Sequence, residues 1–587
     1  MKTLKDSLNF VVSEAFRAEG FDPRLGEVMD SQRPDLCQFQ VNGALGAAKA
    51  LKRNPREIGQ KLADRLAGSP KLASVKVEGP GFINIIVKPS LLAQSLDATL
   101  ADARLGVPER EEACSLVLDF GGPNVAKSMH VGHLRSCTIG DSLQRLARFM
   151  GDRVASDIHL GDWGTQMGML IEAVREREPG LPYFDPAFSG AYPLASPVSM
   201  ADLEQLYPAA SAQCKQDEAA AERARQATME LQQGRRGYRA LWQHFVDVSV
   251  SALKGDLAVM GVSFDLWLGE SHYQEPIPAM LEDLKLRGLA VESEGALVMP
   301  VDAPGDAKPM PPVLLVKGDG GFLYATTDLA TLRDRVRGKA GAIWYVVDKR
   351  QSLHFEQVFR AARKAGYAPE GVALEHLAFG TMNGPDGKPF KTRSGGVMRL
   401  RDLMEMCRAE ALAKMEGMGL AAEVPAEERE DVARKVGLAA LKFADLVNHR
   451  AADYAFDLEK FTRFEGKTGP YLLYAAVRIK SVLRKAKEQG LRPGAVQEPG
   501  EREEALALLL LKYPEALRAA YAQRAPSHLC EHLFQLSQAF SSFYQQCHIL
   551  HEQDPALRAS WLSLASLTLR QLEHGLGLLG IETPERM

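Results

Sequence analysis

The sequence predicts an α/β plus all-α protein, in which a Rossmann-like parallel-sheet domain is joined to a small N-terminal α/β domain and a C-terminal helical bundle. A chain of 587 residues is longer than one hydrophobic core supports, so about three or four domains are expected. Apolar strand-like runs alternate with amphipathic helical stretches in the middle of the chain. Beyond about residue 403 almost every segment has a helical pattern.

The N-terminal domain is expected over residues 1–108, where helical segments accompany the strand-like run VKVEGPGFINIIVK. Gly79, Pro80 and Gly81 predict a turn that divides this run into two short strands. We therefore expect a small mixed domain before the parallel sheet begins.

The parallel-sheet domain is expected over residues 109–400. Its strand-like runs are SLVLDF, RVASDIHL, PVLLVKG and AIWYVVD, and their alternation with helices is typical of parallel strands joined by crossover helices. A helical, charge-rich stretch at about 176–244 interrupts the alternation and predicts an inserted arm or cap. Residues 401–455 are expected to form a helical connector, and residues 456–587 a helical domain punctuated by prolines.

The composition excludes several protein classes. With 46% hydrophobic and 25% charged residues, the chain is neither disordered nor fibrous. Asp6, Glu14 and Glu19 interrupt what would have to be the apolar core of a signal peptide, and no stretch approaches a membrane span, so we expect a cytoplasmic protein with no membrane partner. The seven cysteines form no CxxC pair, which argues against a zinc knuckle or a disulfide framework, and no residue is assigned as a metal ligand.

One basic segment stands out in a chain of net charge -4, RIKSVLRKAKEQGLR at 478–492. Any RNA contact must come from such a local surface, because the chain as a whole is acidic. Lys480, Arg484, Lys485 and Lys487 lie on a predicted helix there. Taken alone, the segment is best interpreted as a solvated helix face.

The strongest chemical signal is a strand that runs into a glycine-rich turn and then a helix, at residues 116–136. The helix is expected to begin near His133 and to continue to Met150, with Gly151 as its stop and a buried stripe of Ile139, Leu143, Leu146 and Met150. Its N-terminus favours phosphate, and Gly132 leaves room for a flat adenine ring. His130 and His133 can donate hydrogen bonds to the phosphates; the alternative is an HxxH metal pair or two core histidines.

A second glycine-rich run, HLGDWGTQMG at 159–168, also follows a strand-like run and leads into a helix. Ligands in open α/β sheets bind at the carboxyl ends of the strands, so both turns are expected to border one crevice. Gly161 and Asp162 are therefore candidates for the nucleotide side of that crevice. The alternative is a plain turn with a packed tryptophan.

Together, PNVAKSMHVGHLRS and HLGDWGTQMG resemble the class I aminoacyl-tRNA synthetases, and specifically the arginyl enzymes. The segment His130–His133 takes the place of the family's His-Ile-Gly-His signature, which lines the ATP site, and the final LGLLGIETPERM is also similar to the family's C-terminus. The resemblance extends over nearly the whole chain. It implies a Rossmann catalytic domain, an N-terminal domain that grips the tRNA elbow, and a C-terminal helical anticodon-binding domain.

The resemblance also implies substrates and site residues. L-Arginine is joined to tRNA(Arg) with ATP and Mg²⁺ through an arginyl-adenylate, and a monomer is the family expectation. Phe82 and Asn84 become candidates for the tRNA D-loop, and Arg484 and Lys485 gain an RNA partner.

Selection of arginine needs a carboxylate that matches a planar guanidinium. Tyr324 and Asp328, in GFLYATTD, match the family's residues that recognise the arginine side chain, and Asn124 matches an asparagine that helps hold its backbone groups. His159 and Gln351 are further candidates for the amino-acid site. Without the resemblance, Asp328 would be interpreted as an acid that stabilises the dipole of a helix in its first turn.

The chain departs from the family pattern at two places. Ile158 stands where similar enzymes often carry an asparagine, which bears on one expected contact with the amino acid. The expected Lys-Met-Ser-Lys-Ser loop appears as PFKTRSGG, with Thr392 in place of the final lysine. Lys127 is the expected replacement cation, and Lys391 and Arg393 could close over the phosphates from the other side. The alternative is a surface lysine and a plain hairpin.

Two other functions remain open at this point. An HxGH phosphate site also occurs in small-molecule nucleotidyltransferases, although those chains lack a long helical C-terminal domain. A catalytically idle paralogue that binds RNA is the second alternative, and the departures at Ile158 and Thr392 keep it in view.

Overall fold

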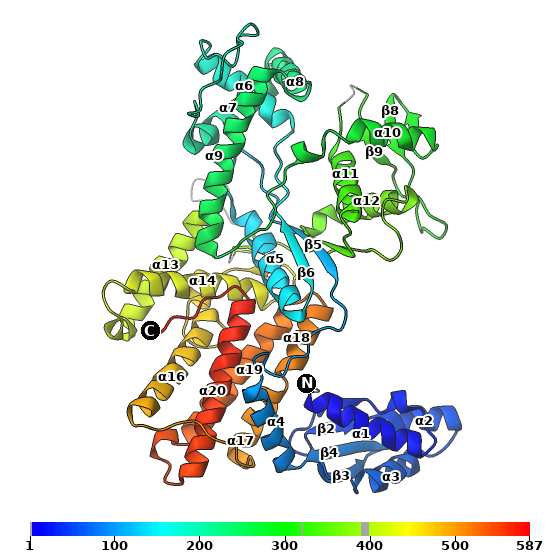
Figure 1. Cartoon of the computed structure of the whole chain (residues 1–587), viewed down its shortest axis with the longest axis vertical. Coiled ribbons are helices and arrows are strands. Elements are labelled where there is room, and N and C mark those ends of the chain that lie inside the picture. Colours follow the sequence, from blue (N-terminus) through cyan, green and yellow to red (C-terminus); the bar gives the residue numbers. More distant parts are fainter. Residues whose placement is uncertain (1–2, 319–320, 385, 389–397) are drawn as a thin grey trace. The chain divides into compact units, whose positions relative to one another are not determined.

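The computed structural model describes residues 3–318, 321–384, 386–388 and 398–587. The chain divides into two compact units (Figure 1). The first contains Met1–Glu109, Phe464–Gly577 and Glu582–Met587, and the second contains Arg110–Arg463 and Leu578–Ile581. The chain therefore enters the second unit twice, the second time for only a few residues near its C-terminus.

The N-terminal part of the first unit is a four-stranded antiparallel sheet with helices around it, in the order β1-β2-β4-β3. The predicted turn at Gly79 and Gly81 is confirmed: both glycines have positive φ angles, of 56° and 138°, and they separate two paired strands. The elements are α1 (Leu4–Ala18), β1 (Val28–Asp30), β2 (Phe39–Val41), α2 (Gly43–Leu51), α3 (Pro55–Leu66), β3 (Leu72–Glu78), β4 (Phe82–Val87) and α4 (Pro89–Ala101).

The rest of the first unit is helical, as the sequence predicts. Its main helices are α16 (Gly469–Glu488), α17 (Glu501–Leu511), α18 (Tyr513–Ala522), α19 (Ser527–Gln546) and α20 (Pro555–Leu578). Ion pairs and backbone contacts join these helices to the N-terminal part: Arg518 pairs with Asp6 at 3.0 Å, and Arg570 donates to the carbonyls of Leu100 and Asp102.

A parallel sheet in the order β11-β10-β5-β6 forms the centre of the second unit. Its strands are β5 (Ser115–Phe120), β6 (Arg153–Asp157), β10 (Ala342–Val346) and β11 (Ala373–His376), and α5 (Val131–Met150) crosses from β5 to β6. Three of the four predicted strand runs therefore lie in the parallel sheet. Because its side chains are buried on both faces, β10 has the continuous apolar sequence that the prediction relied on.

The fourth prediction, PVLLVKG, is wrong in its placement. Val313–Val316 is strand β9, but it pairs antiparallel with β8 (Ala296–Met299), which pairs antiparallel with β7 (Val291–Ser293). The tight turn at Glu294 and Gly295, both with positive φ angles, makes β7 and β8 a hairpin. Consecutive strands joined by such a short turn pair antiparallel, since a parallel pair needs a crossover of a dozen or more residues.

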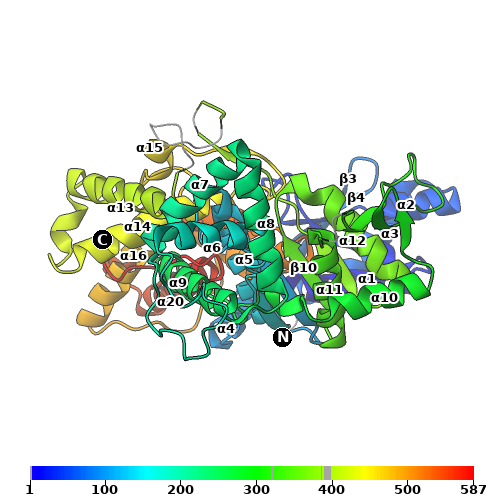
Figure 2. The same cartoon turned by 90° about the horizontal axis from the view of Figure 1, so that it is seen from above.

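A group of four helices interrupts the sheet, and these helices lie together in both views (Figures 1 and 2). They are α6 (Thr165–Arg177), α7 (Met200–Gln216), α8 (Glu218–Gln232) and α9 (Arg236–Met260). Their apolar faces share one hydrophobic cluster that includes Met167, Leu203, Leu231 and Phe245. We call α7, α8 and α9 the helical insertion.

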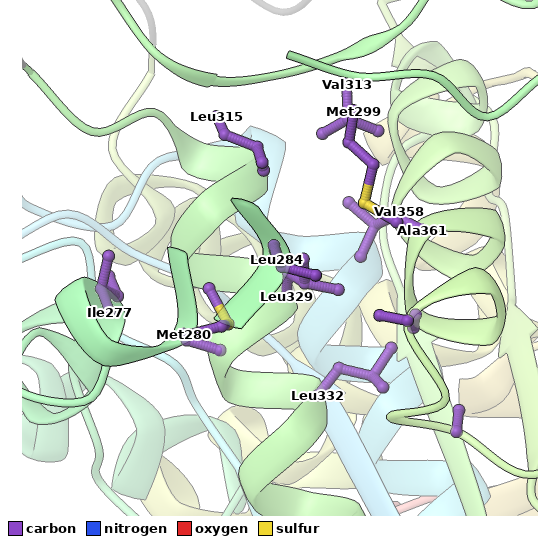
Figure 3. Packing of buried hydrophobic residues seen from close by; sticks show 14 of the residues in the cluster. Ile277, Met280, Leu284, Met299, Val313, Leu315, Leu329, Leu332, Val358 and Ala361 are labelled. Carbon is purple, nitrogen blue, oxygen red and sulfur yellow. The ribbon is translucent and has the colours of Figure 1, made fainter. Parts of the chain in front are cut away.

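A second cluster fixes α11 (Tyr324–Arg337) against α10 (Ile277–Leu286), α12 (Ser352–Lys364) and strands β8 and β9. Leu329 and Leu332 of α11 belong to this cluster, and Figure 3 shows Leu329 beside Leu284 of α10. Because these leucines define the buried face of α11, the polar residues at its N-terminal end are held at a fixed position.

The connector region is helical, with α13 (Leu400–Gly417), α14 (Arg429–Leu446) and the short α15 (Leu458–Phe461). A small parallel pair of strands, β12 (Met382–Asn383) and β13 (Tyr454–Ala455), joins it to the sheet domain. Across the described residues, no helix has both the length and the apolar character needed to span a bilayer.

Candidate functional site

The signature turn ends in a helix that begins at Val131, two residues earlier than predicted, because His130 is its N-cap. His130 Nδ1 accepts a hydrogen bond from the Gly132 amide at 3.0 Å, and the His130 amide donates to His133 Nδ1 at 3.1 Å. The two histidines thus form a reciprocal cap like those usually made by serine or aspartate and glutamate. The predicted buried stripe of α5 and its stop at Gly151, with φ 105°, are confirmed.

This cap fixes the tautomers of both histidines. In each ring Nδ1 is an acceptor, so a neutral ring carries its proton on Nε2. Burial lowers the pKa of His133 to about 3, with smaller contributions from His130 and Lys127, and burial followed by Lys127 lowers the pKa of His130. Both rings are therefore neutral near pH 7, and each keeps an Nε2–H group that can donate to an anion.

Gly132 is required by the cap itself. A Cβ atom at this position would lie 2.7 Å from Cε1 of His130, so any side chain would displace the ring. Ala126 lies earlier in the same turn. Its φ is 67°, in the left-handed region that a residue with a side chain rarely adopts. Its amide donates to Ser249 Oγ at 2.9 Å, which holds the turn in this conformation.

The two glycine-rich runs meet, as the sequence predicts. The Gly122 amide donates to the Ile158 carbonyl at 3.0 Å, and Asn124 and Gly161 pair as in a parallel sheet. A Cβ atom on Gly161 would lie 2.1 Å from Asn124 Oδ1, so the glycine leaves room for the asparagine side chain. Asn124 itself is exposed at the surface of the turn.

Asp162 follows Gly161 directly and accepts two hydrogen bonds from Ser271. Its two oxygens accept hydrogen bonds from the Ser271 amide at 2.9 Å and the Ser271 hydroxyl at 2.6 Å. Gly269 has no room for a Cβ atom because Asp162 lies 2.3 Å from that position. Asp162 therefore holds the short 3-10 turn Glu270–Tyr273 against the second glycine-rich run.

Glu270, the first residue of that turn, is an acid with a raised pKa. Burial, and then the charges of Asp162 and Asp328, raise its pKa from 4.5 to about 8. Among the described residues, no cation pairs with its carboxylate. A half-buried carboxyl beside two other acids is a group that a cationic ligand would stabilise in its charged form.

Tyr324 and Asp328 stand one helical turn apart at the start of α11. Asp328 Oδ2 lies 2.5 Å from His354 Nε2, so the histidine, from α12, orients the carboxylate. Tyr324 is 73% exposed. The pKa of its hydroxyl is raised by partial burial, by Glu270 and by Tyr207, which shows that these groups are neighbours. Gln351 is exposed at the end of a 3-10 turn that precedes α12.

A buried ion cluster lies on the same helix as Tyr324 and Asp328. Arg335 of α11 pairs with Asp119 of β5 at 2.7 Å and with Asp157 of β6 at 2.9 Å. Arg335 is 6% exposed, so these charges lie in the interior. The cluster joins the carboxyl ends of two parallel strands to the helix that carries Tyr324 and Asp328.

His159 follows the strand end in a left-handed conformation, with φ 46°. Its Nδ1 atom is buried and makes no hydrogen bond in the described structure, and its ring lies 5.8 Å from that of Tyr273. The neighbouring Ile158 is fully buried. Its side chain therefore belongs to the core beneath the turn.

Lys127 points its ammonium at the ring of Tyr207, with Nζ 4.5 Å from the ring centroid. It is also close enough to lower the pKa of both signature histidines. Lys391 and Arg393, predicted on the second signature loop, lie outside the described residues.

Phe82 and Asn84 occupy alternate positions of β4 and thus share one face of the N-terminal sheet, opposite the buried Ile83 and Ile85. Asn84 accepts a hydrogen bond from Gln40 at 3.1 Å and lines a hollow of about 110 Å³ on this face. The two candidates for tRNA contact therefore lie on the same face of the sheet, where Phe82 is half-buried and Asn84 is buried.

The basic helix α16 separates into two groups of cations. Lys480 is engaged in ion pairs with Glu573 at 2.8 Å and Glu585 at 2.6 Å. Arg484 and Lys485 are exposed, and no acid among the described residues pairs with them. The second group, together with the exposed Lys487, offers positive charge to a polyanion.

Four residues of the site could not be predicted from the sequence: Glu270, His354, Arg335 and Tyr207. Each lies in an ordinary helical or turn segment and reaches the site only through the fold. The one available signal was the proximity of His354 to Gln351 in the same short segment, DKRQSLH.

Comparison with known families accounts for almost the entire chain. The catalytic domain of class I tRNA synthetases (R) matches residues 95–458, the DALR anticodon binding domain matches residues 472–587, and the arginyl tRNA synthetase N terminal domain matches residues 2–87.

Individual proteins give the same result. The arginine–tRNA ligases of Maricaulis maris and Hyphomonas neptunium are each 52% identical to this chain over the full length of both proteins. Arginyl-tRNA synthetases of Plasmodium falciparum and Thermus thermophilus have the same fold over the full length, with TM-scores of 0.82 and 0.79 at 23% and 24% identity. With its capped HVGH helix and with these matches over the length of the chain, the protein belongs to the arginyl-tRNA synthetases, a family of class I aminoacyl-tRNA synthetases.

Proposed function

We propose that this protein joins L-arginine to the 3′ end of tRNA(Arg), with ATP as the energy source and arginyl-adenylate as the intermediate. Family membership supports the reaction, and the arrangement of charge supports the assignment of residues. The observation that carries it is the contrast between a cluster of carboxyl groups at Glu270 and Asp328 and a pair of neutral donors at His130 and His133. Arginine is a cation and the ATP phosphates are anions.

We call the carboxyl groups of Glu270 and Asp328 the acidic side of the site, and the donors of His130 and His133 its phosphate side. A chain of neighbouring residues connects these two sides. Glu270 lies near both Asp328 and Tyr324, Tyr324 lies near Tyr207, and Tyr207 contacts Lys127. Lys127 in turn lies near His130 and His133. This chain of neighbours supports the proposal that the two subsites belong to one site, which an adenylation reaction requires because both substrates must meet.

On the acidic side, we propose that Asp328 and Glu270 bind the guanidinium while Tyr324 packs beside it. A guanidinium has five donors in a rigid fork, and paired carboxylates satisfy it well. Asn124 and His159 would hold the α-amino and carboxylate groups, with Gln351 at the rim. Asp162 would act through its neighbours, because Ser271 already occupies both oxygens.

On the phosphate side, we propose that the first turn of α5 binds ATP. The Gly132 amide is occupied by the cap, whereas His130 and His133 present Nε2–H donors. Gly161 lines the same junction. Lys127, Lys391 and Arg393 would neutralise charge on the phosphates as it develops.

The first step would be in-line attack by an oxygen of the arginine carboxylate on the α-phosphorus. A new bond forms between that oxygen and phosphorus while the bond to the β-phosphate oxygen breaks, so pyrophosphate leaves with the electron pair. In the second step the 2′-hydroxyl of the terminal adenosine attacks the activated carbonyl, its proton is lost, and AMP leaves. No side-chain nucleophile is needed.

Mg²⁺ belongs to the proposal as an ion that enters with ATP and lowers the negative charge of its phosphates. Groups of three or more histidine, cysteine, aspartate or glutamate side chains suited to a metal were not found in the described part of the chain. We expect the ion to be coordinated mainly by phosphate oxygens and water, as is usual for Mg²⁺ with nucleotides.

For the tRNA, we propose that the outer face of β4, with Phe82 and Asn84, contacts the D-loop and that Arg484 and Lys485 contact the anticodon arm. The proposed enzyme acts in the cytoplasm as a monomer. Sedimentation at several concentrations, with and without tRNA, tests the monomer.

A charging assay with total tRNA and each of the twenty amino acids tests the proposed function. Arginine alone should be attached, and preferential attachment of another amino acid would overturn the proposal. The exchange of pyrophosphate into ATP with arginine, measured with and without tRNA(Arg), separates the alternatives. Exchange that depends on tRNA supports the proposal, exchange without tRNA points to a small-molecule nucleotidyltransferase, and no exchange in either case points to an RNA-binding paralogue.

A further inference from the structure

The helical insertion holds the segment that carries Lys127. Val125 and Ala126, the two residues before this lysine, are buried in the hydrophobic cluster of the insertion, together with Leu203 and Phe245. The strained Ala126 amide is hydrogen-bonded to Ser249 of α9. The signature turn is therefore packed into the insertion over several residues.

The side chain of Lys127 makes its own contact with the insertion. Its ammonium lies over the ring of Tyr207 on α7, 4.5 Å from the centroid, which is cation–π geometry. Tyr207 is half-buried against the same cluster, so its ring is held in place by the insertion. A lysine side chain has four rotatable bonds, and this contact restricts an ammonium that would otherwise sample many positions.

A second contact from the same helix reaches the other side of the phosphate region. Glu204 lies one turn before Tyr207 on α7 and approaches Arg399 at 3.6 Å. The backbone of Arg399 pairs with that of His130. One face of α7 thus contacts both chain segments that flank the signature histidines.

We propose that Tyr207 is a positioning residue for adenylation: its ring holds the Lys127 ammonium beside the site of the ATP phosphates. The inference rests on the proposed function, in which Lys127 contacts the phosphates. The insertion then has a role in the chemical step as well as any role in binding RNA, because a displacement of α7 would move the lysine.

The test is a double-mutant cycle in single-turnover adenylation with arginine, ATP and tRNA(Arg). Tyr207→Leu should reduce the rate of adenylate formation by about tenfold, with little change in the KM for arginine. Tyr207→Phe keeps the aromatic face and should retain most of the activity. In a Lys127→Ala background, Tyr207→Leu should cause no further loss, because there is no ammonium left to position.

Tyr192→Leu is the matched control. Tyr192 is also half-buried against the insertion cluster, but its ring stacks on that of Tyr183, 5.4 Å away, and among the described residues it makes no cation–π contact with Lys127. This variant should keep the wild-type rate.

The outcomes distinguish a failure of the proposed role of Tyr207 from a failure of the proposed role of Lys127. Equal losses from Tyr207→Leu in both backgrounds, or equal losses from Tyr192→Leu, would show a merely structural role and overturn the inference. A wild-type rate in Tyr207→Leu beside a strong defect in Lys127→Ala would also overturn it, with the proposed function intact. A wild-type rate in Lys127→Ala would instead refute the role of the lysine in the proposed function.

Discussion

The two sides of the candidate site handle charge in opposite ways. The phosphate side uses neutral histidines whose protons are fixed by the helix cap, together with a helix N-terminus and one nearby lysine. The acidic side places three carboxyl groups close together, and burial and repulsion keep one of them, Glu270, protonated in the free protein up to about pH 8. The acidic side therefore gathers carboxyl groups, whereas the phosphate side carries neutral donors and the positive charge of Lys127.

This difference indicates how each ligand would be recognised. The phosphate side is preorganised, since its donors are in position before an anion arrives and no protonation change is needed. The acidic side is complete only when a cation enters and stabilises the ionised form of Glu270. Substitutions on the two sides should therefore have different kinetic signatures.

The largest effect is expected from Lys127→Ala on the phosphate side. The adenylation rate should fall by about a hundredfold or more, because the lost interaction strengthens as charge develops in the transition state. Arginine and tRNA binding should remain nearly unchanged. Single-turnover adenylate formation measures this; a near-normal rate would move the role to Lys391 and Arg393.

Asp328→Asn on the acidic side should weaken arginine binding by about 1.5 to 3 kcal/mol, the range for a hydrogen bond to a charged group. The change keeps the size of the side chain and its place beside His354 but removes the charge that attracts guanidinium. Equilibrium binding of arginine and of ATP checks the claim, with ATP affinity as the internal control. Unchanged arginine affinity in a folded variant would exclude this role for Asp328.

Glu270 should make arginine binding depend on pH. Below about pH 8 the free protein holds a proton on Glu270, and a bound guanidinium favours the carboxylate, so binding must release that proton. Arginine affinity should therefore rise by up to about tenfold per pH unit as the pH approaches 8 and level off above it. Calorimetry in buffers of different ionisation enthalpy measures the released proton.

Glu270→Gln is the control for this pH dependence, because it removes the titrating group and keeps the shape. Its arginine affinity should be lower and nearly constant between pH 6 and 8. If the wild-type protein releases no proton when arginine binds, Glu270 does not contact the guanidinium.

The smallest effect is expected from the first unit, far from either side in sequence. Reversal of charge at Arg484 and Lys485 should raise the KM for tRNA several-fold and reduce the dependence of log KM on log salt by about two, since two phosphate contacts are lost. Lys480→Gln is the matched control, because this lysine is already paired with Glu573 and Glu585. If the reversal and the control behave alike, α16 presents only a solvated face.

Much of the fold could be predicted because its signals are local. The run AIWYVV is apolar throughout, as a buried parallel strand must be, and Gly151 ends α5 where a left-handed residue is required. Strand β11 could not be found this way: its sequence ALEH contains two polar residues because the strand lies at the sheet edge and is partly exposed. PVLLVKG was placed in the wrong sheet because strand pattern alone does not identify the partner strand.

The candidate site divides in the same way. The HVGH motif can be recognised from sequence because His130, Gly132 and His133 lie within four positions. The mutual cap that the two histidines form can be seen only in the structure. Glu270 and Tyr207 carry no local signal. Each is assigned a role because the fold brings it near a residue more than fifty positions away in the sequence: Asp328 is near Glu270, and Lys127 is near Tyr207.

We infer that one site has a phosphate side and an acidic side, and that the two sides have separate functions. The most direct test compares Lys127→Ala and Asp328→Asn under identical conditions for arginine affinity, ATP affinity and the single-turnover rate of adenylation at saturating substrates. We expect a crossed result: Lys127→Ala loses rate with arginine affinity intact, and Asp328→Asn loses arginine affinity with ATP affinity intact. If both variants weaken arginine and ATP binding to the same extent, the two sides do not act separately.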